Sequence, residues 1–230
     1  NPLKKGLMPA VADLISVEHA NLQLDGSKKM FIRDKDDKLN LSHHNFLYNT
    51  VRNFVRVLVF SSFYSKKTNW DFMKNGELIT KIFEILRNEI SRGNTISDLV
   101  LNIVMLLTNG IQRSRKEIKK IFVKHLFENG VESVLRNLFI GTANPKFTPL
   151  FVAKTALLLL ELKKVVENEQ MEKILSVLED QFEDYKSNCA EEVVQEINLK
   201  EFAEKMLMYL EVFRKNEKKK PKKFFSKLFK

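Results

Sequence analysis

The feature that most constrains the fold is a long stretch, residues 10–144, in which no proline occurs and apolar residues recur at three- and four-residue steps. This spacing places the apolar side chains on one stripe of an α-helix, whereas a half-buried strand alternates apolar and polar residues. Residues 55–60 alternate in the manner of a strand, but Val51, Phe54 and Leu58 complete a helical stripe across them. Because the sequence offers no partner strand, we predict an all-α fold.

Turns rich in glycine and asparagine separate the expected helices. Many helices end at a residue in the left-handed conformation, which glycine adopts without a steric penalty. We expect helices to stop at five such places: Asn75-Gly76, Arg92-Gly93-Asn94, Asn109-Gly110, Asn129-Gly130 and residues 141–145. Apolar stripes over residues 171–185 and 193–213 predict two later helices, and the charged stretch 25–45 is predicted to be an exposed, inserted loop.

The net charge of +10 is concentrated at one end of the chain. Residues 215–230 hold eight Lys and one Glu, so this segment carries +7 and residues 1–214 carry only +3. We therefore predict a single, nearly neutral helical domain over residues 1–214, in which residues 165–214 are C-terminal capping helices. Residues 215–230 are predicted to be a flexible tail, and the basic composition is a property of that tail.

Three glycines, Gly6, Gly76 and Gly130, stand at similar places before apolar helices. Each of these helices is followed by a longer, more apolar one, and Gly76 and Gly130 also follow a short helix. This order of short helix, glycine, second helix and longer third helix resembles the armadillo repeat. Residues 6–15 look like the second-helix motif of that family, and residues 104–109 resemble the end of its third helix.

The resemblance implies a right-handed superhelical stack of about three irregular armadillo-like repeats over residues 6–163, closed by the C-terminal capping helices. The three glycines stand 70 and 54 residues apart, whereas such repeats run ~40–47 residues. The loop at residues 25–45 and a long first helix at residues 113–127 would take up the difference. An irregular helical bundle is the alternative architecture.

In a stack of this kind the third helices line a concave groove. Polar residues beside the apolar stripes of those helices are therefore candidates for binding a peptide backbone or an acidic side chain: Arg52, Asn53, Arg56, Asn102 and Asn109. Of these, only Asn109 matches the groove asparagine of the family, so the asparagine ladder of nuclear import receptors is not expected. The alternative interpretation is that these are ordinary exposed helix residues.

Four basic residues recur at helical spacing in the middle of the chain: Arg113, Lys116, Lys120 and Lys124. We call these four residues the basic stripe. Such a stripe suits contacts with the phosphates of a nucleic acid. The alternative is the solvated face of an amphipathic helix.

The tail combines lysines with large aromatic residues: Lys218, Lys219, Lys220, Lys222, Lys223, Phe224, Phe225 and Phe229. Basic and aromatic side chains together suit an anionic membrane surface. A lysine run also resembles a nuclear localisation signal or a nucleic-acid arm. The aromatic residues suit docking on a protein partner or on the last helix of the chain, and a solubilising tail is the remaining alternative.

Several chemistries are excluded by spacing. No two of the seven glycines lie closer than eleven residues, so no glycine-rich loop cradles a phosphate. The four histidines lack the spacing of a metal site, and residues 34–45 fail as a calcium loop because Leu39 stands where glycine is required. A charged helix face explains the carboxylates of residues 167–184. We predict no catalytic residue, metal site or cofactor.

Together these patterns predict a non-enzymatic adaptor that presents a groove to a protein partner, uses the tail for targeting and has no small-molecule substrate. One alternative is a nucleic-acid-associated factor, of RNA or ribonucleoprotein, that uses the basic stripe and the tail. A further alternative is a factor recruited peripherally to an anionic membrane. The single Cys189 fits a reducing compartment, so we expect the cytoplasm, with the nucleus or a membrane surface as additional locations, and not secretion.

Overall fold

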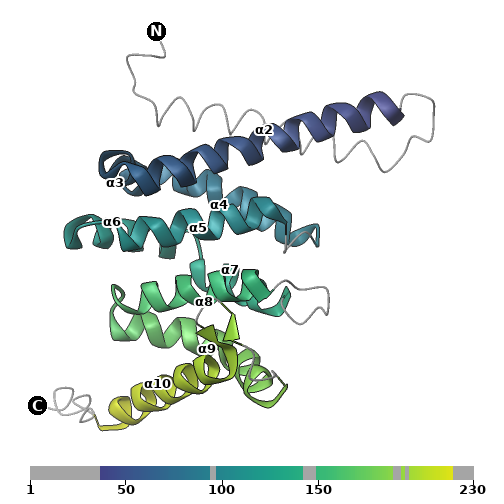
Figure 1. Cartoon of the computed structure of the whole chain (residues 1–230). Coiled ribbons are helices and arrows are strands. Elements are labelled where there is room, and N and C mark those ends of the chain that lie inside the picture. Colours follow the sequence, from purple (N-terminus) through teal and green to yellow (C-terminus); the bar gives the residue numbers. More distant parts are fainter. Residues whose placement is uncertain (1–36, 94–96, 142–148, 189–192, 195–196, 220–230) are drawn as a thin grey trace, which may run out of the picture. The chain divides into compact units, whose positions relative to one another are not determined.

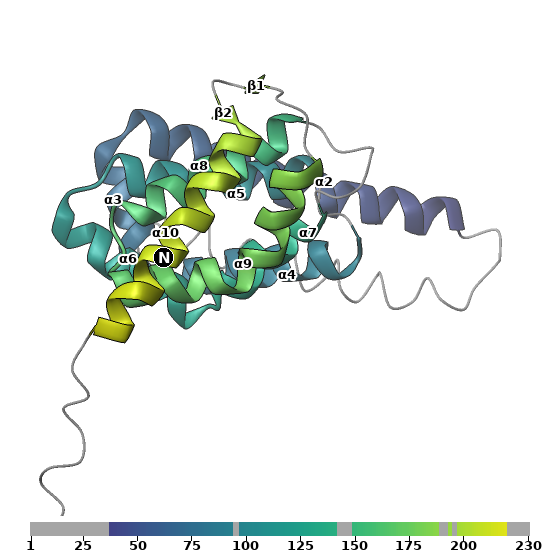
Figure 2. The same cartoon turned by 90° about the horizontal axis from the view of Figure 1, so that it is seen from below.

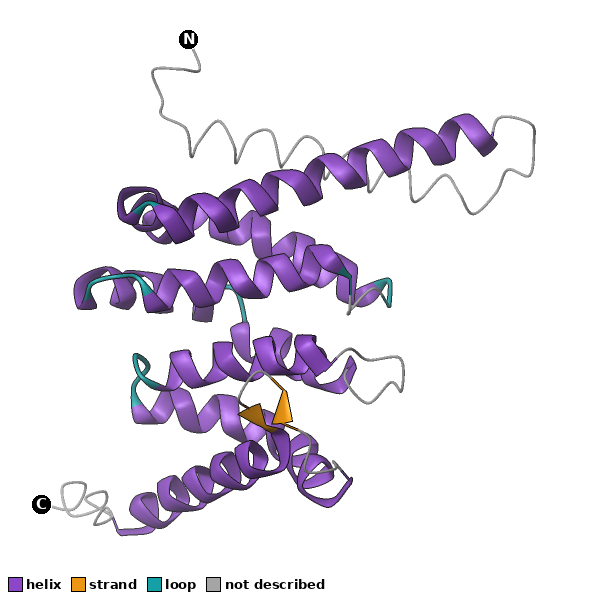
Figure 3. Cartoon of the chain, viewed as in Figure 1, coloured by secondary structure: helices purple, strands orange, loops and turns teal. Residues whose placement is uncertain are grey.

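The computed structural model describes residues 37–93, 97–141, 149–188, 193–194 and 197–219. These residues fall into two compact units, the first ending at Val165 and the second beginning at Val166. The sequence predicts one domain over residues 1–214, whereas the structure divides the chain at the start of the predicted capping helices. Helices make up nearly all of the described part, and the all-α prediction is confirmed there (Figure 3).

The first unit contains seven described helices: α2 (Asp37–Tyr64), α3 (Lys66–Lys74), α4 (Gly76–Ser91), α5 (Asp98–Gln112), α6 (Lys116–Glu128), α7 (Val131–Gly141) and α8 (Pro149–Lys163). Helix α5 packs against α2 on one side and α8 on the other, so these three helices lie in successive layers (Figure 1). Helix α3 packs against α6, and α4 packs against α7. Helices α3, α4 and α5 therefore each contact the helix that comes three places later in the chain.

Helix α5 is the centre of the first unit. It contacts α2, α3, α4, α6 and α8, and its residues from Leu106 to Ile111 are buried without interruption. A helix that is apolar on most sides must be surrounded by other helices. The helical interpretation of residues 55–60 is confirmed as well, since they lie in α2, where Val55, Leu58 and Val59 are buried.

Polar side chains begin several helices of the first unit. The Ser65 hydroxyl accepts a hydrogen bond from the Thr68 backbone N–H at 3.2 Å, and the Asn75 side chain accepts one from the Leu78 N–H at 3.0 Å. These bonds satisfy N–H groups that have no partner within the helix. Two of the predicted stops contain a left-handed glycine, since φ is 76° at Gly93 and 67° at Gly130.

The predicted helix end at Asn109-Gly110 is wrong. Helix α5 continues through Gly110 to Gln112. A Cβ atom at Gly110 would lie 3.1 Å from Cε1 of Phe122, a contact tighter than side chains normally make. This glycine is therefore needed because α5 and α6 approach each other closely, and its role is in packing rather than in ending a helix.

Three other boundaries differ from the prediction. Residues 37–45, predicted as the end of a loop, belong to α2, and residues 25–36 lie outside the described residues. Residues 193–198, predicted as the start of a helix, contain the two-residue strands β1 (Val193–Val194) and β2 (Ile197–Asn198). The helix starts after them because the Asn198 side chain accepts a hydrogen bond from the Glu201 N–H at 3.0 Å.

The second unit consists of α9 (Asn168–Asn188), the antiparallel pair of β1 and β2, and α10 (Leu199–Lys219). Helix α10 packs along α9 (Figure 2), with the Phe182 and Phe202 rings edge to face at 5.8 Å between centroids. Both guanidinium Nη atoms of Arg214 donate to the Glu179 carboxylate at 2.7 Å. These hydrogen bonds lower the pKa of Glu179, because they favour the charged carboxylate.

We expect this pair to make the second unit sensitive to acid. Because the folded state lowers the pKa of Glu179 from its ordinary value of 4.5, the stabilisation is complete above that value and is lost as the pH falls through the lowered pKa. Glu179→Gln should lower the thermal midpoint measured by far-UV circular dichroism at about pH 7, and its difference from the wild type should shrink as the pH falls through the lowered pKa of Glu179. Glu183→Gln is the matched control, since the ion pair of Glu183 within the described residues is a local one, with Lys186 on α9 at 3.7 Å. A difference for Glu179→Gln that stays constant with pH would contradict this account.

Candidate functional site

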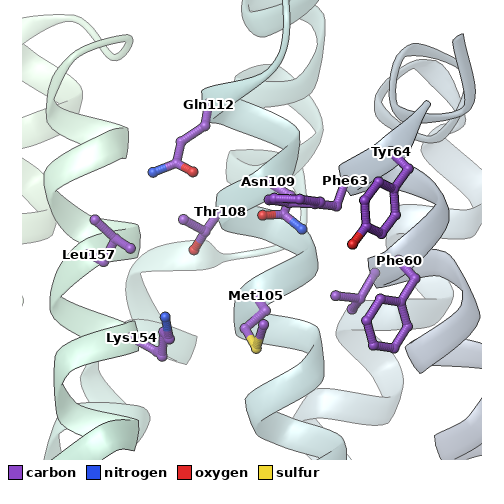
Figure 4. A pocket seen from close by; sticks show the side chains of 10 residues that line it. Phe60, Phe63, Tyr64, Met105, Thr108, Asn109, Gln112, Lys154 and Leu157 are labelled. Carbon is purple, nitrogen blue, oxygen red and sulfur yellow. The ribbon is translucent and has the colours of Figure 1, made fainter. Parts of the chain in front are cut away.

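A hollow of about 330 Å³ lies where α2, α5 and α8 meet in the first unit, and we call it the three-helix groove. The lining residues come from all three helices: Val59, Phe60, Phe63 and Tyr64 of α2, Met105, Thr108, Asn109 and Gln112 of α5, and Lys154 and Leu157 of α8. In Figure 4 the aromatic side chains of α2 lie on one side of α5, and Lys154 and Leu157 lie on the other. Helix α5 therefore forms the floor of the groove.

Helical spacing explains how these residues share one face. Met105, Asn109 and Gln112 follow one another at four- and three-residue steps along α5, and Phe60 and Phe63 do so along α2. The opposite stripe of α2 is buried, because Val51, Val55 and Leu58 are at most 3% exposed. The same amphipathic helices that form the core thus present a second set of side chains to the groove.

The aromatic side of the groove is unusually open to solvent. Phe60 is 56% exposed, Phe63 42% and Tyr64 80%. The Phe63 and Tyr64 rings meet edge to face at 5.1 Å between centroids. A single exposed aromatic residue is common on protein surfaces, but a group of three beside a hollow is typical of an interaction site.

The polar residues of the groove differ in whether they already have partners. The Thr108 hydroxyl donates to the Val104 carbonyl at 2.8 Å, and Gln112 Nε2 donates to Glu161 at 3.2 Å. Asn109 is only 9% exposed, yet its side chain makes no hydrogen bond within the described residues. Its amide is therefore available to a ligand that enters the groove.

The electrostatic character of the groove is positive. Lys154 forms no ion pair within the described part of the chain, and no carboxylate belongs to the lining. The nearby Glu161 is 8% exposed at its side chain and is already paired with Lys164 at 2.6 Å. An acidic ligand is therefore favoured over a basic one.

The predicted groove residues lie in different places. Asn109 lines the groove. Asn102 lies one turn before Met105 on α5, and the exposed Arg56 lies one turn before Phe60 on α2. Arg52 is 3.8 Å from Asp98 and connects α2 to the start of α5.

Asn53, the last of the five predicted groove residues, is exposed on α2 and does not line the groove. The prediction missed the aromatic residues Phe60, Phe63 and Tyr64 and, on α8, Lys154 and Leu157. The sequence contained a signal for the two phenylalanines, since Phe60 and Phe63 follow Arg56 at four- and three-residue steps and so lie on the same face of α2. Their exposure could not be derived from spacing alone.

The basic stripe does not form one surface. Arg113 follows the end of α5, where its guanidinium lies over the Phe63 ring at 3.8 Å from the centroid and donates to the Phe63 carbonyl oxygen. Lys116 and Lys120 are exposed on α6, and Lys124 is 3.6 Å from Glu128. Arg113 therefore belongs with the aromatic side of the groove, whereas the three lysines occupy a solvated helix face.

The predicted tail begins inside a helix. Lys215 is exposed on α10, which extends to Lys219 and so includes the backbone of Lys218. The other predicted tail residues lie outside the described residues: Lys220, Lys222, Lys223, Phe224, Phe225 and Phe229. Across the described residues, no helix is long and apolar enough to cross a membrane, and no group of three His, Cys, Asp or Glu side chains could hold a metal ion.

Comparison with protein-family models, with curated proteins and with solved structures finds no match for the chain. The fold and the site define a class only in general terms: an all-α protein in which three neighbouring helices share an aromatic, positively charged groove. The function is therefore argued from this groove.

Proposed function

We propose that the chain is a non-enzymatic interaction module that holds a segment of a partner protein in the three-helix groove. The observation that carries this proposal is the exposure of Phe60, Phe63 and Tyr64 beside a hollow whose floor contains Met105 and Asn109. Aromatic side chains are enriched at protein interfaces, and tyrosine is among the residues that contribute most to binding energy there. An asparagine amide at the floor suits the backbone of a bound segment, because it can both donate and accept hydrogen bonds.

In this proposal the first unit is an armadillo-like stack. Helices α3, α4 and α5 form one repeat and α6, α7 and α8 the next, with α2 as the third helix of the repeat before them. The proposal is supported by the contacts between equivalent helices, α3 with α6, α4 with α7 and α5 with α8. It is also supported by the position of the groove, which is lined by the three helices that would be third helices.

The proposed occupant is a peptide segment with a large apolar side chain and acidic neighbours. The apolar side chain would fill the space between Phe60, Met105 and Leu157. The acidic neighbours would match Lys154 and the exposed Arg56, since no carboxylate lines the groove in the described part of the chain. Residues 215–230 would serve as a separate targeting segment or a second contact.

Selection from a random peptide display library on the full chain tests this proposal. We expect the selected peptides to be enriched in aromatic or large aliphatic residues together with Asp and Glu, and depleted in Lys and Arg, because the groove is apolar and positive. Met105→Glu is the comparison variant, since it places a negative charge on the half-buried floor of the groove. Its selected peptides should lose the acidic enrichment. Enrichment of basic peptides, or the same peptides from both proteins, would contradict the proposal.

A further inference from the structure

A second hollow, of about 340 Å³, lies beside the three-helix groove at the turn between α5 and α6. It is lined by Lys66, Trp70, Gln112, Arg113, Ser114 and Arg115, and we call it the cationic hollow. Gln112 lines both hollows, and Arg113 covers Phe63 of the groove. A segment bound in the groove can therefore continue into the cationic hollow.

The cationic hollow gathers positive charge without a counter-charge. Three of its six lining residues, Lys66, Arg113 and Arg115, are cations, and none of the six is acidic. Within the described residues, none of these three cations forms an ion pair with a carboxylate. A concave surface with charge of one sign attracts a ligand of the opposite sign.

Trp70 and Arg115, which both line the cationic hollow, contact each other. The Arg115 guanidinium lies over the Trp70 ring at 4.7 Å from its centroid. A cation over the face of an aromatic ring is attracted by that ring. This contact therefore orients the Arg115 guanidinium at the hollow.

The two walls of the cationic hollow are held together by a buried side chain. Asn69 of α3 is 0% exposed, and its Nδ2 donates to the Ser114 hydroxyl at 2.9 Å and to the Gly110 carbonyl at 3.5 Å. This contact fixes the turn that carries Arg113 and Arg115 against the helix that carries Lys66 and Trp70. The backbone positions that carry the three cations are therefore held in a fixed arrangement.

We propose that the cationic hollow binds a phosphorylated side chain of the segment that occupies the three-helix groove, an inference that rests on the proposed function. A phosphoryl group carries a charge of about −1.5 to −2 and three acceptor oxygens. It thus matches two arginines and a lysine better than a carboxylate does, because a carboxylate has one charge and two oxygens.

The test uses a peptide selected on the groove and resynthesised with phosphoserine, glutamate or serine next to its apolar anchor. We expect the phosphoserine form to bind about tenfold or more tightly than the serine form, because hydrogen bonds to a charged group are among the strongest. Lys66→Ala with Arg115→Ala should remove this preference. Lys116→Ala with Lys120→Ala is the matched control, because it removes the same charge from exposed positions on α6 and should keep the preference.

Acetyl-phosphoserine-amide, titrated while the fluorescence of Trp70 is followed, separates this inference from the groove itself. Trp70 is the single tryptophan of the chain. A saturable fluorescence change that is lost in the Lys66 and Arg115 double variant therefore locates the phosphate in the cationic hollow, even where no peptide binds the groove.

Several outcomes would count against this inference. Equal binding of the phosphoserine and serine peptides, or equal losses in both double variants, would overturn it. Equal binding of the phosphoserine and glutamate forms would overturn the assignment to phosphate. The assignment to a phosphorylated protein segment would also be overturned if a short single-stranded RNA bound more tightly than the phosphopeptide and if its binding required Lys66 and Arg115.

Discussion

Phe122→Ala should lower the free energy of unfolding of the first unit by about 3–5 kcal/mol. Phe122 is 0% exposed, and its ring meets Phe72 edge to face at 5.7 Å between centroids. It also lies against Gly110 of α5. The alanine variant loses the burial of the ring and the aromatic contact and leaves a cavity where α3, α5 and α6 meet.

Ile121→Ala is the matched control for this prediction, since Ile121 is the preceding residue of α6 and is 42% exposed. Its cost should stay below about 1 kcal/mol. Urea unfolding followed by the fluorescence of Trp70 reports on the first unit, because this tryptophan lies on α3, the helix that also carries Phe72. A loss for Phe122→Ala no larger than that for Ile121→Ala would contradict the packing described for α3, α5 and α6.

The helices of the first unit could be predicted from sequence because apolar spacing and turn residues agree. The stripe containing Leu78, Ile82 and Leu86 falls in α4, and all three residues are buried. Gly93 and Gly130 adopt the left-handed conformation at predicted stops. Where local propensity and periodicity indicate the same boundary, the fold has little freedom to place it elsewhere.

Gly110 shows why the remaining boundaries were harder to predict. As part of an Asn-Gly pair it has the local signature of a helix end, but its position is determined by the Phe122 ring of another helix. The sequence separation between the two residues carries no information about that contact. Tertiary packing thus overrode the turn signal, and only the structure could show it.

The candidate site was predictable in part. Asn109 was identified on the third-helix pattern, and it lines the groove. The exposed aromatic residues of α2 were not identified, because helical spacing gives the angle of a side chain around its helix but not which neighbours cover it. The cationic hollow was harder still, since Lys66, Trp70 and Arg115 come from segments that are joined only by tertiary contacts such as Asn69 with Ser114.

Phe60→Ala should weaken binding of a groove-selected peptide about thirtyfold or more. Large aromatic side chains at the centre of an interface commonly contribute about 2 kcal/mol or more when truncated, which corresponds to a factor of about 30 in the dissociation constant. Phe60 lines the groove and is 56% exposed. Because most of the side chain is already in solvent, the substitution should leave the stability of the first unit nearly unchanged.

The measurement that tests the groove most directly is the ratio of peptide dissociation constants, by fluorescence polarisation, for Phe60→Ala and Val57→Ala. Val57 lies one turn earlier on α2 and is 57% exposed, as open as Phe60, but it does not line the groove. We predict a loss of about thirtyfold for Phe60→Ala and less than about twofold for Val57→Ala. Equal, small losses in both variants would contradict the claim that α2, α5 and α8 together hold the partner segment.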